Sequence, residues 1–186
     1  MPLLDFFDRT NDMRIRNMIN LAALKKRSVL VARLAVCLFT GLPVNGQSPN
    51  VPAFRFSKLN QAGVVTDKNV PAGKKSLFVF FDVTCPHCHD AIKSFSKNYR
   101  LLDPVSVYLI TEDSQPAAVA FLSHNAKELW QRKNVTVLLD TYREFIEKFK
   151  PVKYPSMFLY SETKRLLLYS DEPKDVAKIL IKIKGE

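Results

Sequence analysis

The sequence contains no hydrophobic run long enough to cross a bilayer comfortably. Its longest uninterrupted apolar stretch, residues 34–44, has 11 residues, whereas a membrane-spanning helix needs about 20. The stretch follows basic residues at positions 25–27, as the apolar core of a signal peptide follows its basic segment. The small or medium-sized side chains just before Gln47 then fit a signal-peptide cleavage site. We therefore predict an N-terminal extension with a signal peptide over residues 1–46, and export to the periplasm or cell envelope.

Two alternatives concern this N-terminal segment. Residues 28–44 could stay attached as an uncleaved membrane anchor, with Arg33 near one end. Met13 or Met18 could be the true start, because the polar stretch before the basic residues is long for a signal peptide. Cys37 does not fit a lipid-attachment site, because a bulkier residue precedes it than such sites use.

Acidic residues are also scarce: 18 Asp and Glu stand against 28 Lys and Arg, for a formal net charge of +10. Residues 1–46 hold seven basic and three acidic residues, which leaves 21 against 15, or +6, for residues 47–186. This excess is scattered, and aromatic and basic residues do not interleave as they do on nucleic-acid-binding surfaces. We predict a solvated basic surface and no nucleic-acid partner.

No internal repeat, low-complexity tract or linker divides residues 47–186, so we expect a single domain there. Short apolar runs rich in β-branched and aromatic residues, typical of buried strands, alternate with stretches of helical periodicity. The predicted strands are residues 77–81, 105–110, 135–139, 156–160 and 165–169.

Apolar stripes with helical spacing lie between and after these strands, and we expect each stripe to pack in the core. They are Ile92, Phe95, Tyr99 and Leu102; Val119, Leu122, Ala126, Leu129 and Trp130; Tyr142, Phe145, Ile146 and Phe149 behind a predicted N-cap at Asp140; and Val176, Ile179, Leu180 and Ile183.

The order of these elements predicts the fold class. Strands joined by helices belong to a parallel sheet, whereas a connection as short as residues 161–164 makes the last two strands antiparallel. Residues 51–67 alternate weakly and turn at Gly63, which predicts a β-hairpin. The sequence thus predicts an α/β domain: a mixed sheet with a parallel core and an antiparallel terminal hairpin, helices on both faces, and an N-terminal β-hairpin.

Cysteine is scarce as well, because only Cys85 and Cys88 remain once a signal peptide is removed. A disulfide that closes so short a loop constrains the unfolded chain little, so we interpret the pair as chemical rather than structural. The pattern places Cys85 between a strand and the first turn of a helix, with Pro86 at the first helical position. Backbone N–H groups and the helix dipole favour a thiolate there, and the thiolate is the nucleophile of disulfide exchange. His87 can add a hydrogen bond or a positive charge.

These features resemble the thioredoxin superfamily, and within it the exported TlpA/ResA-like thiol-disulfide oxidoreductases. The resemblance covers residues 50–184 and rests on the V-P-A-F-R-F start, the FVFFDVTCPHC junction, the extra helix and strand of residues 116–140, and KYPSMFLY. It implies a thioredoxin-like fold, protein thiols and disulfides as substrates, and a redox partner in the membrane or envelope. It implies no cofactor and no metal.

The resemblance also assigns roles to particular residues. Cys85 is the attacking thiol, Cys88 is the less exposed resolving thiol, and the two form a redox-active disulfide. The family's cis-proline maps onto Pro155, preceded by Tyr154. Backbone beside this proline is implied to pair with an extended substrate peptide.

The sequence departs from the family pattern at the proton acceptor of the resolving cysteine. Val79 stands where many thioredoxins have a buried acid, and Ala91 stands where many ResA-like members have Glu. Asp82, His87 or His89 could take this role, and we favour His87. The motif CPHC is shared with DsbA-like oxidases, so the direction of electron flow stays open.

Two metal-based readings of the motif are less well supported. C-x-x-C-H is also the haem c attachment pattern, but His89 would have to leave the first helical turn to ligate iron. A haem also needs a pocket, whereas packing on the sheet already accounts for all the apolar helix stripes. Zinc would need four ligands within residues 85–89, which are too close in sequence to close a tetrahedron easily, and no second Cys/His cluster exists.

The fold family suggests two other functions, which the sequence supports less well. A peroxiredoxin-type peroxidase needs P-x-x-x-T-x-x-C, which is absent because Thr84 adjoins Cys85. A binding module could hold extended peptides beside Pro155 without turnover, but the intact cysteine pair argues against it. The sequence therefore favours an exported thiol-disulfide oxidoreductase.

Overall fold

The computed structural model describes residues 46–60 and 62–185. The predicted signal peptide, the alternative anchor at residues 28–44 and Cys37 lie outside these residues. Within them, no helix combines the length and the apolar character that crossing a membrane requires. The strands are β1 Arg55–Lys58, β2 Val64–Thr66, β3 Ser76–Phe80, β4 Ser106–Thr111, β5 Val135–Leu139, β6 Ser156–Tyr160 and β7 Leu166–Ser170. The α-helices are α2 Pro86–Lys97, α3 Gln115–Asn125, α4 Glu144–Phe149 and α5 Val176–Lys184.

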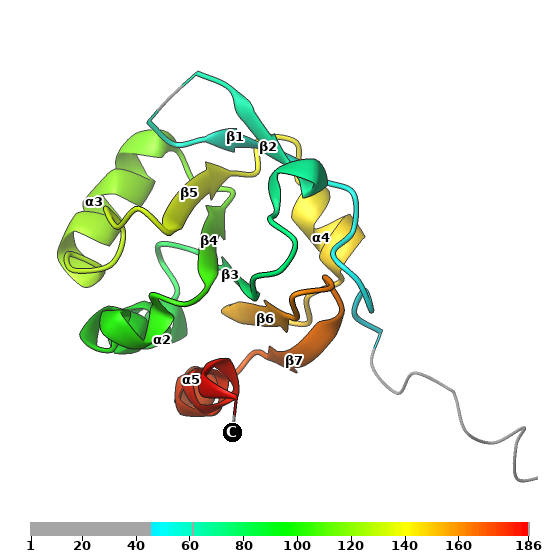
Figure 1. The fold of residues 1–186 in the computed structure, drawn as a ribbon. Helices are drawn as coiled ribbons and strands as arrows, with labels where there is room; N and C mark the ends of the chain where they lie inside the picture. The colour runs from blue at the N-terminus through cyan, green and yellow to red at the C-terminus, as the bar shows by residue number, and fades with distance from the viewer. Residues whose placement is uncertain (1–45, 61, 186) are drawn as a thin grey trace, which may run out of the picture. The chain divides into compact units, whose positions relative to one another are not determined.

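The strands form one mixed sheet in the order β2-β1-β5-β4-β3-β6-β7 (Figure 1). β3, β4 and β5 are parallel, and β6 and β7 are antiparallel to each other, as the sequence predicts. β6 departs from the rule that strands joined by a helix are parallel, because it runs antiparallel to β3. The six residues of α4, at about 1.5 Å each, are too short to return the chain along the sheet, so β6 starts at the edge where β5 ends.

The predicted N-terminal hairpin is present and belongs to the main sheet. β1 and β2 are antiparallel, and Gly63 in their connection has φ +124°, a conformation that side-chain-bearing residues rarely adopt. β1 also pairs antiparallel with the carboxyl end of β5, where Ser57 lies opposite Leu139. The sequence does not predict this second pairing.

The two faces of the sheet bury different side chains. Successive residues of a strand point to opposite faces: Leu77 and Val79 pack with α2, α3 and α5, while Phe78 and Phe80 join an aromatic cluster with α4. Figure 1 shows α2, α3 and α5 on one side of the sheet and α4 on the other. The predicted α/β fold with helices on both faces is therefore confirmed.

Two helices end earlier than their apolar stripes suggest. α2 stops at Lys97, and residues 99–102 form a 3₁₀ turn; α3 stops at Asn125, so Ala126 and Leu129 are buried outside it. In each case a terminal asparagine amide donates to a carbonyl four residues back, Asn98 to Ser94 and Asn125 to Phe121. Such side-chain bonds compete with the continuing helical ladder.

The expectation that every residue of the third stripe is buried is wrong for two residues. Phe145 and Phe149 are fully buried, but Tyr142 is 69% exposed and Ile146 is 49% exposed. The buried Asp140 carboxylate accepts the N–H groups of Glu144 and Phe145, at 2.9 and 2.7 Å, and so starts the helix two residues after Tyr142. A helix this short buries only one of its sides, so the Ile146 side chain stays partly exposed to solvent.

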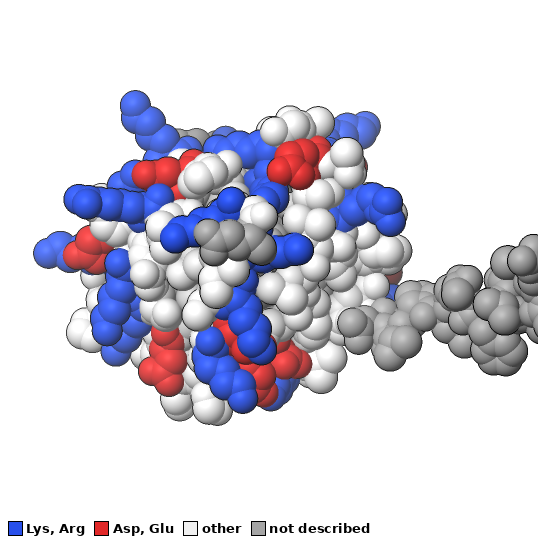
Figure 2. Space-filling view, turned by 60° about the horizontal axis from the view of Figure 1, so that its bottom comes forward, with Lys and Arg blue, Asp and Glu red and all other residues white. Residues whose placement is uncertain are grey.

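Basic residues do not form one continuous platform on the face seen in Figure 2. Lys and Arg side chains are spread over it, with acidic and uncharged residues between them. Among the described residues, ion pairs join Lys178 to Asp175 and Arg132 to Asp103. The prediction that no nucleic acid binds remains a prediction.

Candidate active site

The topology brings the predicted site residues to one edge of the sheet. The carboxyl ends of the parallel strands meet at this edge, and β6 begins there, with Ser156 opposite Phe80. The segment that follows β3 at this edge carries the CPHC motif, and Pro155 immediately precedes β6. As a result, the sulfur of Cys85 lies 4.0 Å from the backbone oxygen of Tyr154.

The two cysteines occupy different environments although they are three residues apart. Cys85 is the residue before α2, in an extended conformation, and Pro86 takes the first helical turn as predicted. Cys85 is partly exposed, whereas Cys88 is completely buried. The Cys88 N–H donates to the Cys85 carbonyl at 3.0 Å. Both residues are free thiols in the structure.

Burial governs the acidity of Cys88. It raises the pKa of the Cys88 thiol far above its ordinary value, and the neighbouring Cys85 and the negative charge of Asp82 act in the same direction. The backbone N–H of Asp82, 3.5 Å from the Cys88 sulfur, acts in the opposite direction. Cys88 is therefore a protonated thiol at neutral pH, and it needs a base before it can attack.

No acid occupies the two positions that the family pattern favours, since Val79 and Ala91 are both fully buried apolar residues. Carboxylates instead come from the segments that follow β3 and β4. The Asp82 carboxylate accepts the backbone N–H of Thr84 at 2.7 Å and its hydroxyl at 2.6 Å. The Asp113 carboxylate accepts the N–H of Val83 at 3.0 Å. These bonds hold the segment that leads from β3 to Cys85.

Glu112 is a further residue of this edge that the sequence analysis missed. One of its carboxylate oxygens is buried without a hydrogen-bond partner among the described residues, and the other lies 3.5 Å from Nε of the largely exposed Arg143. Burial raises the pKa of Glu112; Arg143 opposes this, while the charges of Asp140 and Asp113 add to it. Its position directly after a buried parallel strand was the available signal, because such positions meet at the functional edge of α/β sheets.

Tyr154 adjoins the dithiol through its backbone oxygen, 4.0 Å from the Cys85 sulfur. Its ring packs on Phe80, with centroids 4.9 Å apart, and the Tyr154–Pro155 bond is cis, as the resemblance implies. Burial raises the pKa of Tyr154 to about 12, and the charges of Glu112 and Asp82 contribute. The phenol therefore stays a neutral hydrogen-bond donor at physiological pH.

The two histidines of the motif differ in their surroundings. His87 is exposed, and within the described residues no hydrogen bond joins it to either cysteine. His89 is partly buried; its Nε2 lies 3.0 Å from the carbonyl of Val83, and its ring stands edge-on against Phe121 at 4.8 Å. To ligate a haem iron through Nε2, His89 would have to break this bond. The structure thus gives His89 a packing role, and a catalytic role for His87 stays a prediction.

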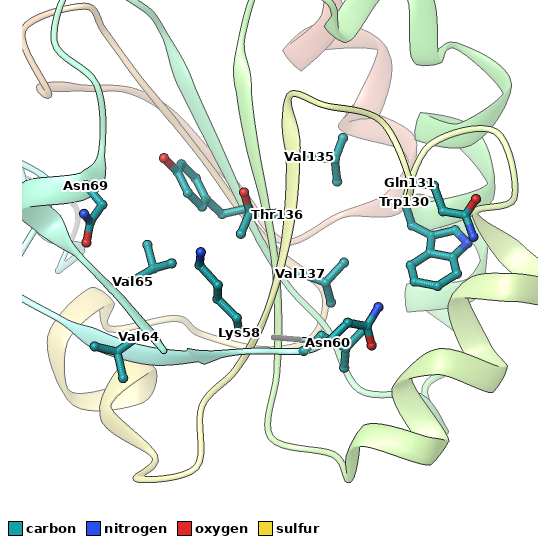
Figure 3. Close-up of a pocket in the computed structure, with 12 residues that line it drawn as sticks. Lys58, Asn60, Val64, Val65, Asn69, Trp130, Gln131, Val135, Thr136 and Val137 are labelled. Atoms are coloured by element: carbon teal, nitrogen blue, oxygen red, sulfur yellow. The ribbon is translucent and has the colours of Figure 1, made fainter. Parts of the chain in front are cut away.

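A wider hollow lies away from the dithiol. It has a volume of about 480 Å³ and opens between the N-terminal hairpin and the amino end of β5, as Figure 3 shows, with Lys58, Tyr108 and Trp130 among its lining residues. The dithiol lies at the carboxyl end of the parallel strands, and none of the lining residues is a cysteine, histidine or carboxylate. We therefore place the candidate site at the dithiol rather than in this hollow.

Solved structures share this fold at low sequence identity. A protein assigned as thiol:disulfide interchange protein DsbE from Chlorobium tepidum is 19% identical, with a TM-score of 0.59 over 75% of this chain and 96% of that one. The thioredoxin domain of a thiol-disulfide oxidoreductase from Bacteroides vulgatus is 17% identical, with a TM-score of 0.60 over 74% and 97%. A peroxiredoxin-like protein from Aquifex aeolicus is 15% identical, with a TM-score of 0.57 over 77% and 89%.

Sequence comparison places the chain in a family. No curated protein sequence is similar enough to count as a relative. The profile of the AhpC/TSA family, however, matches residues 49–168, which is more than half of the chain and includes Cys85, Cys88 and Pro155. This match and the shared fold support a redox enzyme and confirm the resemblance to the thioredoxin superfamily. The chain therefore belongs to the AhpC/TSA family of redoxins.

Proposed function

We propose that the protein is an exported thiol-disulfide oxidoreductase that exchanges disulfides with protein substrates through Cys85 and Cys88. The observation that carries the proposal is the unequal environment of the two thiols. Cys85 is partly exposed at the start of α2, so its sulfur is accessible to a substrate. Cys88 is buried one turn further along and protonated. This arrangement suits one attacking and one resolving thiol.

The proposed reaction proceeds in two exchange steps. The Cys85 thiolate attacks one sulfur of a substrate disulfide, a mixed disulfide forms, and the other substrate sulfur leaves as a thiolate. Cys88 then loses its proton and attacks the Cys85 sulfur, which releases the second substrate thiol. The substrate gains two electrons and two protons, and the enzyme is left with a Cys85–Cys88 disulfide. The reverse sequence oxidises a substrate dithiol.

We assign Asp82 as the proton acceptor of Cys88. Its backbone N–H already contacts the Cys88 sulfur at 3.5 Å, and its negative charge contributes to the raised pKa of that thiol. Val79 and Ala91 cannot accept a proton, and the exposed His87 makes no hydrogen bond to either cysteine within the described residues. Asp82 therefore supplies a carboxylate on the residue whose backbone contacts the Cys88 sulfur, whereas the sequence alone favours His87.

Substrate binding is proposed beside Pro155. The carbonyl of Tyr154 lies close enough to the Cys85 sulfur, at 4.0 Å, for a substrate chain bound there to present its own sulfur to Cys85. Export to the envelope, the domain limits of 1–46 and 47–186, and a membrane or envelope redox partner complete the proposal. They rest on the N-terminal sequence and on the resemblance.

Two cysteine variants test the proposed function in an insulin-reduction or dithiol-oxidation assay. Cys85→Ser removes the nucleophile and should abolish turnover. Cys88→Ser removes the resolving thiol and should leave substrate trapped on Cys85 as a mixed disulfide, detectable as a reductant-sensitive mass increase. Full activity of Cys85→Ser would contradict the mechanism.

Asp82→Asn tests the proton acceptor. The asparagine oxygen can still accept from Thr84, but it carries no charge. In single-turnover experiments, formation of the mixed disulfide should keep its rate, while its resolution should slow about tenfold or more and recover as pH rises. Asp90→Asn, on the exposed side of α2, is the matched control. Equal resolution rates in the wild type and Asp82→Asn would remove Asp82 from the mechanism.

A further inference from the structure

The histidine that directly follows the dithiol contacts the chain at two points around Cys85. Nε2 of the His89 ring lies 3.0 Å from the carbonyl oxygen of Val83, which precedes Cys85 by two positions. A carbonyl oxygen only accepts hydrogen bonds, so Nε2 carries the proton and is the donor. The backbone N–H of His89 donates to the carbonyl of Cys85 itself, at 3.2 Å. His89 therefore connects helix α2 to the segment that leads into the reactive cysteine.

The His89 ring completes a set of hydrogen bonds that fix this segment. The N–H groups of residues 83–85 donate to the Asp113 carboxylate, the Asp82 carboxylate and the Asp82 carbonyl, in that order, at 3.0, 2.7 and 3.3 Å. The His89 ring adds the bond to the Val83 carbonyl. The peptide group that follows Val83 is thus held at both of its polar atoms.

Packing fixes the orientation of the His89 ring. The ring stands edge-on against Phe121 of α3, with centroids 4.8 Å apart. Phe121 in turn stacks on the buried Phe81, which lies directly before the segment, at 5.1 Å. A side chain that packing has already ordered loses little further rotamer entropy when it forms a hydrogen bond. The His89 ring is therefore a preorganised donor for the Val83 carbonyl.

The position of Cys85 depends on this segment, whereas the position of Cys88 depends on the helix. Cys88 is completely buried within α2, while Cys85 is the extended residue between the segment and the helix. A disulfide forms only when the two Cβ atoms come within about 3.5–4.5 Å of each other. Any motion of the segment that takes Cys85 out of this range lowers the effective concentration of one thiol at the other.

We propose that His89 is a positioning residue of the dithiol, because its bond to the Val83 carbonyl holds Cys85 within reach of Cys88 and so favours closure of the disulfide. The inference rests on the proposed function, since it concerns the resolving step of the same exchange. In that step the Cys88 thiolate attacks the Cys85 sulfur, a new S–S bond forms, and the substrate sulfur leaves as a thiolate. His89 acts on this step through the backbone and transfers no proton.

Reaction of the reduced full-length protein with dithiobis(nitrobenzoate) separates the two steps. Attack by Cys85 releases one coloured thionitrobenzoate, in a phase whose rate rises with reagent concentration. Attack by Cys88 on the mixed disulfide releases the second, in a phase that does not depend on reagent concentration. The protein ends with one disulfide and the reagent as two thiols, so the electrons balance. Equilibration with reduced and oxidised glutathione then gives the equilibrium constant for closure.

Substitutions at His89 distinguish its hydrogen bond from its packing. In His89→Gln the amide nitrogen stands as many bonds from Cα as Nε2 of histidine, so the donor is kept. In His89→Asn the amide nitrogen stands closer to Cα and falls short of Val83. His89→Phe keeps a ring against Phe121 but has no donor. The matched control is His124→Phe, the same change at an exposed position near the end of α3.

His89→Asn and His89→Phe should keep the wild-type rate of the first phase and slow the second about fivefold, the factor that one hydrogen bond represents. The equilibrium constant for closure should fall by the same factor, which makes the reduction potential about 20 mV less negative. His89→Gln and His124→Phe should match the wild type. The slow second phase should persist as pH rises, because no base is lost, whereas that of Asp82→Asn should recover.

A second phase and an equilibrium constant that stay at wild-type values in His89→Asn and His89→Phe would overturn the positioning role. A loss in His89→Gln as large as that in His89→Asn would overturn it too. Both results would leave the dithiol mechanism standing, because the first phase still reports attack by Cys85. If Cys85→Ser releases thionitrobenzoate as fast as the wild type, the proposed function fails and the positioning role fails with it.

Discussion

At the scale of single residues, burial creates chemical differences between groups of the same type. Cys85 and Cys88 are three positions apart, but only Cys88 is completely buried, and its raised pKa follows from that burial. Glu112 likewise differs from its acidic neighbours because one of its oxygens is buried without a partner among the described residues. Residue type and spacing identified the cysteines from sequence, but burial of Glu112 depends on the packing of segments distant in the chain.

Glu112 makes stability depend on pH. Its raised pKa means that the folded protein binds this proton more tightly than the unfolded chain does. Ionisation of Glu112 therefore costs stability, beginning as pH rises past its ordinary value of about 4.5 and complete above the folded pKa. Glu112→Gln removes this cost. Urea unfolding should show the variant and the wild type nearly equal at low pH and the variant more stable at neutral pH. A difference of the opposite sign would contradict the burial argument.

At the scale of elements, α4 differs from the structure that its periodic sequence pattern predicts. The i, i+3, i+4, i+7 spacing from Tyr142 predicts a buried stripe, but the Asp140 carboxylate binds the N–H groups of residues 144 and 145 and starts the helix later. Only Phe145 and Phe149 reach the aromatic cluster, with ring centroids 4.2 Å apart. The prediction of Asp140 as the N-cap is wrong, because Arg143 occupies that position and Asp140 binds the first helical N–H groups from three residues further back.

Phe145 and Ile146 provide a matched pair of substitutions on this helix. Phe145→Ala removes a fully buried ring that also stacks on Phe80 at 4.2 Å, and it should lower the free energy of unfolding by about 3–5 kcal/mol. Ile146→Ala changes a half-exposed side chain and should cost less than about 1 kcal/mol. Denaturant midpoints at a constant m-value provide the comparison. Similar losses for both variants would show that α4 packs differently.

At the scale of the whole molecule, the order of strands and helices and the main residues of the site were predictable from sequence, but the geometry of the site was not. The runs at 135–139 and 156–160 coincide with β5 and β6, because buried strands need apolar residues wherever they lie in the sheet. The antiparallel direction of β6 and the pairing of β1 with β5 depend on contacts between distant segments, which periodicity does not encode. The antiparallel direction of β6 brings Tyr154 to Cys85, and the end of β4 places Glu112 at the same edge of the sheet.

The central claim is that Cys85 and Cys88 act as one reversible two-electron pair, and a redox titration of the full-length protein tests it most directly. The protein is equilibrated with thiol–disulfide buffers of graded potential, free thiols are alkylated, and peptide masses report the state of each cysteine. The account predicts that Cys85 and Cys88 lose their thiols together, with a loss of two hydrogens, over a transition of about 30 mV per tenfold change in ratio. Independent alkylation of Cys85 and Cys88 at every potential, with no disulfide between them, would contradict it.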